Sequence, residues 1–148
     1  MSKVERDSHG EQAILERIES WARSLRAKDA SGVMTHYADG ALSFDLAPPL
    51  THRGDEIRQG LEAWFPTWDG PIGYELRDLA VTVGGDVAFA HGLARLTGKR
   101  TDGTETDVWF RTTVCLRRIG AEWTIVHEHS SVPFYMDGSY KAAVDLRP

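Results

Sequence analysis

The chain has 148 residues, of which 41% are hydrophobic and 26% are charged, and its formal net charge is −5. These proportions are typical of one globular domain that buries its core without help from disulfides or metals. The acidic balance argues against binding to nucleic acid or to anionic membrane surfaces.

The cysteine count and the distribution of apolar residues narrow the class of protein further. Cys115 is the only cysteine, which excludes an intrachain disulfide and a cysteine zinc cluster. No apolar run is long enough to cross a membrane, and the first residues lack the apolar core of a signal peptide. We therefore expect one cytoplasmic domain over residues 1–148. Its ordered core should span about 10–136, between loose ends at 1–9 and over about the last ten residues.

Helical spacing dominates the first part of the chain. Ser8 and Glu11 have the spacing of a capping box, and apolar residues then recur at helical intervals over 14–25. Asp29 is placed to cap a short second helix. A third helix is predicted from about Asp55 to Phe65, where Pro66 ends it.

The remaining segments alternate as strands do. Residues 41–46 alternate until Ala47-Pro48-Pro49 ends the strand, and the β pattern resumes from Tyr74. Turns are predicted at 84–86, at 102–103 and at 119–122. The order is therefore helix, helix, short strand, helix and four antiparallel strands, which predicts an α+β domain with its helices on one side of the sheet.

The segment 123–133, WTIVHEHSSVP, has an unusual composition for a strand, because charge is normally depleted there. Strict alternation places two sets of side chains on opposite faces. One set is Trp123, Ile125, His127 and His129, and the other is Thr124, Val126, Glu128 and Ser130.

Two segments carry a resemblance to a known superfamily. Residues 37–54, YADGALSFDLAPPLTHRG, resemble the segment of ketosteroid isomerase that bears its catalytic aspartate, and Asp45 takes that place. Residues 85–133 resemble the association domain of calcium/calmodulin-dependent kinase, through Arg95-Leu96-Thr97 and the closing W-x-x-V-H-x-H-x-S-x-x-P. Together with the element order, they look like the superfamily of nuclear transport factor 2, ketosteroid isomerase and the SnoaL-like cyclases.

The resemblance implies a cone-shaped, curved antiparallel sheet that wraps around the N-terminal helices and encloses an apolar pocket. His127 and His129 would lie on the outer face, where many relatives dimerise, so a homodimer through that face is expected. The side chains that it implies to point inward are Asp45, Phe89, His91, Leu93, Arg95, Trp109, Arg111, Thr113, Val126, Glu128 and Ser130.

Asp45 is the first candidate for catalysis, because a carboxylate in an apolar cavity has a raised pKa and can act as a general base. The alternative is that Asp45 caps the turn before Pro48 or pairs with an arginine. The resemblance also implies positions for the two oxyanion donors of ketosteroid isomerase. The donor tyrosine's place falls at Trp21, and the donor aspartate's place falls near Thr113.

Two basic residues complete the candidate catalytic set. Arg111 could clamp a carboxylate or stabilise an enolate oxygen, or it could form a structural ion pair with Asp45 or Glu128. His91 could relay a proton, as a histidine does in the dehydratases of this superfamily. It could equally be a hydrogen-bonded core residue.

The aromatic residues suggest a flat, apolar ligand, although each could simply be core. Those predicted to line the pocket are Trp21, Tyr37, Trp64, Phe89 and Trp109. His127-x-His129 has the spacing of two metal ligands, but no third or fourth ligand is evident, so neither a metal nor a cofactor is expected.

Two functions remain open from the sequence. The first is a cofactor-free enzyme that removes a proton next to the carbonyl of a small apolar compound, as an isomerase, a cyclase or a dehydratase does. The second is a ligand-binding or oligomerisation module without turnover.

Overall fold

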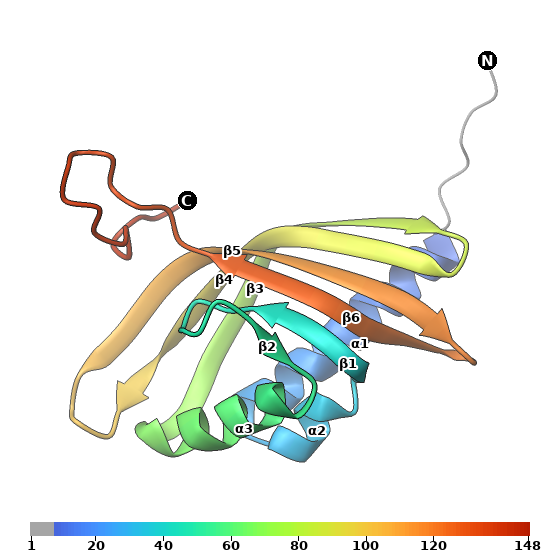
Figure 1. Cartoon of the computed structure of the whole chain (residues 1–148), viewed down its shortest axis with the longest axis horizontal. Coiled ribbons are helices and arrows are strands. Elements are labelled where there is room, and N and C mark those ends of the chain that lie inside the picture. Colours follow the sequence, from blue (N-terminus) through green and yellow to red (C-terminus); the bar gives the residue numbers. More distant parts are fainter. Residues whose placement is uncertain (1–7) are drawn as a thin grey trace.

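A computed structural model describes residues 8–148 (Figure 1). The observed element order agrees with the predicted α+β order. Of the loose end predicted at 1–9, residues 1–7 lie outside the described residues, and Ser8 and His9 belong to α1, so for these two the prediction is wrong. The elements are α1 (Ser8–Arg26), α2 (Ala30–Met34), β1 (Tyr37–Phe44), β2 (His52–Arg53), α3 (Asp55–Trp64), a 3-10 turn η1 (Phe65–Thr67), β3 (Trp68–Gly84), β4 (Val87–Arg100), β5 (Glu105–Ile119) and β6 (Glu122–Ser131).

The strands form one curved, unclosed sheet with the order β2-β1-β6-β5-β4-β3. Strands β3 to β6 are an antiparallel meander, whereas β1 joins β6 in parallel. The helices lie on one face of this sheet (Figure 1), as predicted. The short strand β2 was not predicted, and β1 and β3 begin earlier than their alternating patterns suggested.

Local signals explain where the helices form. In α2, the side chain of Asp29 accepts a hydrogen bond of 3.0 Å from the backbone N–H of Gly32, which satisfies a donor that has no partner within the helix. In α1, the buried residues Ile14, Ile18, Ala22 and Leu25 form one apolar stripe that packs on the sheet.

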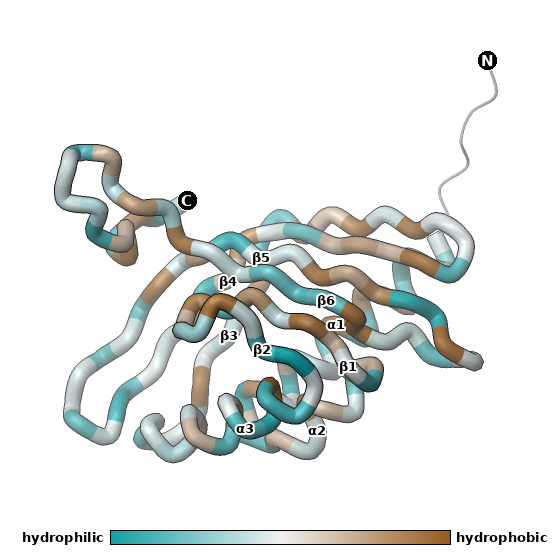
Figure 2. The backbone as a smooth tube through the Cα atoms, in the orientation of Figure 1, coloured by the Kyte–Doolittle hydropathy of each residue, from teal (hydrophilic) through white to brown (hydrophobic). Residues whose placement is uncertain are grey.

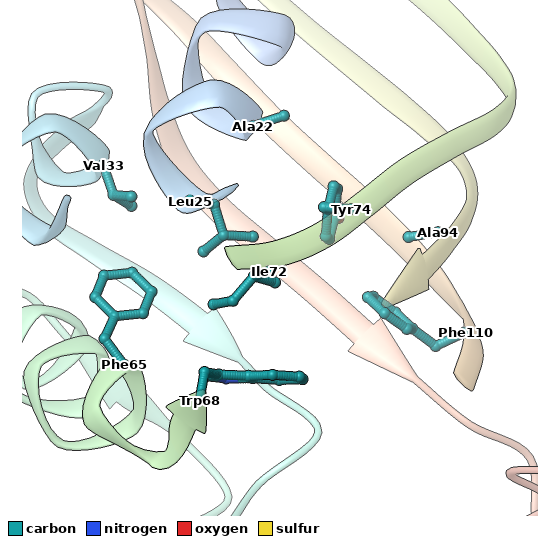
Figure 3. Close-up of a cluster of buried hydrophobic side chains, with 9 residues drawn as sticks. All are labelled: Ala22, Leu25, Val33, Phe65, Trp68, Ile72, Tyr74, Ala94 and Phe110. Carbon is teal, nitrogen blue, oxygen red and sulfur yellow. The ribbon is translucent and has the colours of Figure 1, made fainter. Parts of the chain in front are cut away.

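The core lies between the helices and the inner face of the sheet. One cluster joins the first half of α1, at Ile14 and Ile18, to Ala88, Ala90, Leu116, Trp123 and Ile125. A second cluster, drawn in Figure 3, gathers Ala22, Leu25, Val33, Phe65, Trp68, Ile72, Tyr74, Ala94 and Phe110. In Figure 2 the hydrophobic and hydrophilic stretches alternate along the strands, as expected for a sheet with one buried face.

The inner faces of β4 and β5 differ from the prediction. The buried residues of β4 are Ala88, Ala90 and Ala94, and those of β5 are Phe110, Thr112 and Leu116. Their neighbours along each strand therefore face outward. The inward orientation predicted for Phe89, His91, Leu93, Arg95, Trp109, Arg111 and Thr113 is wrong. The packing of Ile14 and Ile18 against Ala88 and Ala90 gives the reason, because α1 approaches the sheet where the strands carry small side chains.

A β-bulge sets the phase of β6. Cys115 pairs with His127, whereas the next residue, Leu116, pairs with Ile125, so Val126 has no partner in β5. The first half of β6 therefore buries Trp123 and Ile125, and the second half turns Glu128 inward. Strict alternation could not give both results, because one extra residue reverses every side chain beyond it.

The bulge also decides the places of Val126 and the histidines. Val126 borders a surface hollow of about 360 Å³ with Arg117 and Ile119, so its predicted place on the inner face is wrong. His127 and His129 lie on the outer face, as predicted, where each contacts the ring of Phe44, with centroids 4.7 and 5.3 Å apart.

Beyond β6, the chain folds back on itself instead of ending loosely as predicted. Phe134 and Ala142 form an antiparallel bridge, and the backbone N–H of Ala143 donates to the carbonyl of Pro133 at 2.8 Å. Ala143 is buried. Within residues 8–148, no helix combines the length and the apolar character needed to span a membrane.

We predict that Ile14→Ala lowers the free energy of unfolding by about 2–5 kcal/mol, because it leaves a cavity in a fully buried site. The adjacent Leu15 is 39% exposed, and Leu15→Ala should change stability by about 0.5 kcal/mol or less. Urea denaturation of both variants measures the difference, and equal losses would contradict the described packing of α1.

Candidate functional site

Glu128 of β6 is the centre of a polar cluster on the inner face of the sheet. The hydroxyl of Tyr37 donates to Glu128 Oε2 at 2.7 Å, and the hydroxyl of Ser43 donates to Glu128 Oε1 at 3.0 Å. Both donors come from β1, which lies beside β6 (Figure 1). The carboxyl group is thus held at both oxygens.

Helix α1 extends the cluster through Trp21. The indole Nε1–H of Trp21 donates to the hydroxyl oxygen of Tyr37 at 3.0 Å, so the proton of Tyr37 is directed to Glu128. The Trp21 ring also meets the edge of Tyr74 at a centroid distance of 5.2 Å. A directed chain of hydrogen bonds therefore runs from Trp21 through Tyr37 to Glu128.

The surroundings perturb the acidity of this cluster. Burial raises the pKa of Glu128 above its ordinary value near 4.5, and the negative charge of Asp45 raises it further. The hydrogen bonds from Tyr37 and Ser43 act in the opposite direction but do not cancel the rise. Burial, followed by the charge of Glu128, raises the pKa of Tyr37 well above 10.0, so its hydroxyl remains a donor.

Asp45 lies just beyond the end of β1, on the same side as Ser43 by alternation. Its side chain is exposed, and Oδ1 accepts a hydrogen bond of 2.7 Å from the backbone N–H of Leu46. The predicted burial of Asp45 in an apolar cavity is therefore wrong, and the alternative of a local turn contact agrees with the structure. Its charge nevertheless acts on both Glu128 and Tyr74.

A second polar pair lies further along the same face. Ser130 donates to the hydroxyl of Thr112 at 3.4 Å, and Thr112 is buried. Thr112, rather than the predicted Thr113, is thus the inward threonine of β5. Sequence reasoning missed Ser43, Tyr74 and Thr112. Ser43 could have been found, because it alternates in phase with Asp45.

The other predicted catalytic residues lie on the opposite face of the sheet. Arg111 Nε donates to Ser131 Oγ at 3.1 Å, and His91 stacks on Phe89 at a centroid distance of 6.4 Å. Neither residue meets Glu128, because alternate residues of β4 and β5 point away from the helices. The predicted partnership of Asp45 with Arg111 and His91 is therefore not formed.

The predicted aromatic residues divide between the two faces. Trp21 and Tyr37 belong to the polar cluster. Trp64 packs on Phe65 and Trp68 at the edge of the core, which agrees with the alternative that Trp64 is a core residue. Trp109 lies on the outer face, where the guanidinium groups of Arg77 and Arg95 are 6.0 and 5.8 Å from the centre of its ring. Arg95 also pairs with Asp107 at 2.9 Å.

Across residues 8–148, no three His, Cys, Asp or Glu side chains are grouped so that they could hold a metal ion. The two histidines of β6 contact Phe44 instead, and Nδ1 of His127 lies 2.7 Å from the carbonyl oxygen of Leu42.

The fold of the whole chain is similar to those of several solved structures. An NTF2-like protein of unknown function from Pseudomonas putida KT2440 is 34% identical, with a TM-score of 0.88 over 97% of this chain and 100% of that chain. More distant matches share the fold alone. A candidate calcium/calmodulin-dependent protein kinase II association domain from Xanthomonas campestris is 19% identical, with a TM-score of 0.73 over 88% and 94% of the two chains.

A candidate scytalone dehydratase from Novosphingobium aromaticivorans is 11% identical, with a TM-score of 0.74 over 82% of each chain. No curated protein gives a significant match to the sequence. The family model for the SnoaL-like domain matches residues 14–135, a range that includes Trp21, Tyr37, Ser43 and Glu128. The chain therefore belongs to the family of SnoaL-like domains, within the NTF2-like fold.

Proposed function

We propose that the Glu128 cluster is a proton-transfer site that acts on a small apolar carbonyl compound without a cofactor. The observation that carries this proposal is a carboxyl group on the inner face of the sheet, with a raised pKa and fixed donors at both oxygens. A raised pKa favours the protonated form, which can donate a hydrogen bond to a ligand.

The roles follow from the surroundings of the two carboxyl groups. Asp45, at the exposed end of β1, removes the proton next to the ligand carbonyl, and the electron pair of that C–H bond forms an enolate. Protonated Glu128 donates its hydrogen bond to the developing oxyanion. Tyr37 and Ser43 hold Glu128 in place, and Trp21 orients Tyr37. Isomerases, cyclases and dehydratases of carbonyl compounds share this first step.

The apolar character of the ligand follows from the neighbouring side chains. Tyr74 and Phe110 pack together on the same inner face, with ring centroids 6.2 Å apart, and both belong to the cluster in Figure 3. Glu128 as a residue is only partly buried, and we propose that a ligand reaches its carboxyl group from the inner face. Flat apolar ketones fit this combination of aromatic wall and single acid.

We also propose that the chain forms a homodimer through the outer face of the sheet. Phe89 is 44% exposed there, beside His91, and Phe44 lies between His127 and His129. Structural neighbours that are named association domains support this second proposal. It is compatible with either a catalytic or a purely ligand-binding inner face.

The proton-transfer proposal predicts hydrogen–deuterium exchange next to the carbonyl of a suitable aromatic or cyclic ketone. NMR in D₂O over a panel of such ketones measures this step without knowledge of the final product. Asp45→Asn should slow the exchange by about 10²–10⁴-fold, the usual contribution of a general base. Asp39→Asn, an exposed acid of β1, is the matched control. Exchange that is equally fast in the Asp45 and Asp39 variants would rule out Asp45 as the base.

The raised pKa of Glu128 also predicts how the stability of the fold depends on pH. Because its pKa is higher in the folded than in the unfolded chain, the folded state holds the proton more tightly. The contribution of Glu128 is therefore present below the unfolded pKa and is lost as the pH rises through the folded pKa. Denaturation between pH 4 and pH 8 should show this loss in the wild type and not in Glu128→Gln. Glu105→Gln, at an exposed site, should behave as the wild type does. A profile for Glu128→Gln that matches the wild type would refute the raised pKa.

A further inference from the structure

The segment after β6, residues 132–148, forms an arm that stands away from the helices and from the body of the sheet (Figure 1). The arm holds its own shape. The backbone N–H of Tyr135 donates a hydrogen bond to the carbonyl of Lys141 at 2.8 Å, and the Tyr135 hydroxyl donates a hydrogen bond to the carboxylate of Asp145. Near its end, Arg147 lies 3.6 Å from Asp107 of β5, which ties the arm to the outer side of the sheet.

The arm exposes much of its apolar surface to solvent. Figure 2 shows several hydrophobic stretches along it. Eleven large apolar residues are exposed in the described chain, and five of them lie in these 17 residues. The five are Phe134, Met136, Tyr140, Val144 and Leu146. Such a concentration on a projecting segment marks an interaction surface rather than scattered surface residues.

The alignment with a solved relative extends into the arm. The Pseudomonas putida structure aligns with 97% of the 148 residues, which leaves only about four residues outside the alignment. Most of the 17-residue arm must therefore lie inside it, at a TM-score of 0.88. The arm therefore belongs to the length of chain that two proteins, 34% identical, have in common.

The outer face of the sheet complements the arm in both polarity and charge. It carries three more of the exposed apolar residues, Val87, Phe89 and Ile119. Arg111 and Arg117 also lie on this face, and neither has an ion pair within residues 8–148. On the arm, the carboxylate of Asp137 accepts hydrogen bonds only from Ser139 in this part of the chain. Opposite charges and apolar patches are thus available on two surfaces of one molecule.

We propose that the arm of one copy packs across the outer sheet face of a second copy, and that the second copy returns the same contact. Two surfaces that are complementary on one chain satisfy each other in a two-fold dimer, in which every contact occurs twice. The apolar arm residues cover Phe89, and the turn at Asp137 meets the arginines of β5. This inference rests on the proposed homodimer and names the segment that closes it.

The experiment is the dimer dissociation constant, measured by sedimentation velocity on the full chain and on point variants. Met136→Asp combined with Tyr140→Asp removes two exposed apolar contacts, and it should weaken dimerisation about 100-fold or more. Both side chains are largely exposed, so the fold of the single chain does not depend on them. Leu50→Asp is the matched control, because Leu50 is 94% exposed in the loop between β1 and β2 and belongs to neither the arm nor the strands of the sheet.

The outcomes separate the two proposals. A full chain that remains monomeric at all concentrations overturns both the dimer and the arm contact. A dimer that Phe89→Glu weakens, but that the arm variant leaves unchanged, overturns the arm contact alone. If the arm variant loses the dimer while Leu50→Asp dimerises as strongly as the wild type, the result supports the exchange of arms between copies.

Discussion

The extra residue at Val126 is the constraint on which the site depends. With Val126 unpaired, β6 buries Trp123 and Ile125 against α1 and then turns Glu128 to the same inner face two residues after the bulge. Without the bulge, burial of Ile125 would carry His127 inward and leave Glu128 in solvent. Core packing and the placement of the acid are therefore compatible only because the strand carries one residue more than its partner.

The position of Glu128 then determines the chemistry of its neighbours. An acid that is partly removed from water is costly to ionise unless it is hydrogen-bonded, and here two elements, β1 and α1, supply the bonds. Tyr37 and Ser43 of β1 hold its two oxygens, and Trp21 of α1 fixes Tyr37. The parallel pairing of β1 with β6 brings these groups together although they lie about 85 to 107 residues apart in the sequence. The same pairing places Asp45 at the open end of the cluster.

Much of the fold was predictable from local signals. The cap at Asp29, the stripe of α1 and the turn residues between the strands gave the element order, and two sequence resemblances led to the family. The faces of β4 and β5 were not predictable in the same way. Large apolar residues such as Phe89 suggested an inward face, yet close packing of α1 requires alanine there, at Ala88 and Ala90. Helix–sheet distance is a tertiary property that alternation within one strand does not contain. For the same reason Arg111 and His91 were assigned to the wrong side.

The central claim is that Glu128 is an acid with a raised pKa, and its direct titration tests this claim. Carbon-13 NMR of labelled glutamate side chains, with Glu128→Gln to assign the signal, follows the carboxyl group as the pH changes. The structure predicts a midpoint above the ordinary value near 4.5, which falls when Asp45→Asn removes the neighbouring charge. A midpoint at or below 4.5 that does not respond to Asp45→Asn would contradict the account.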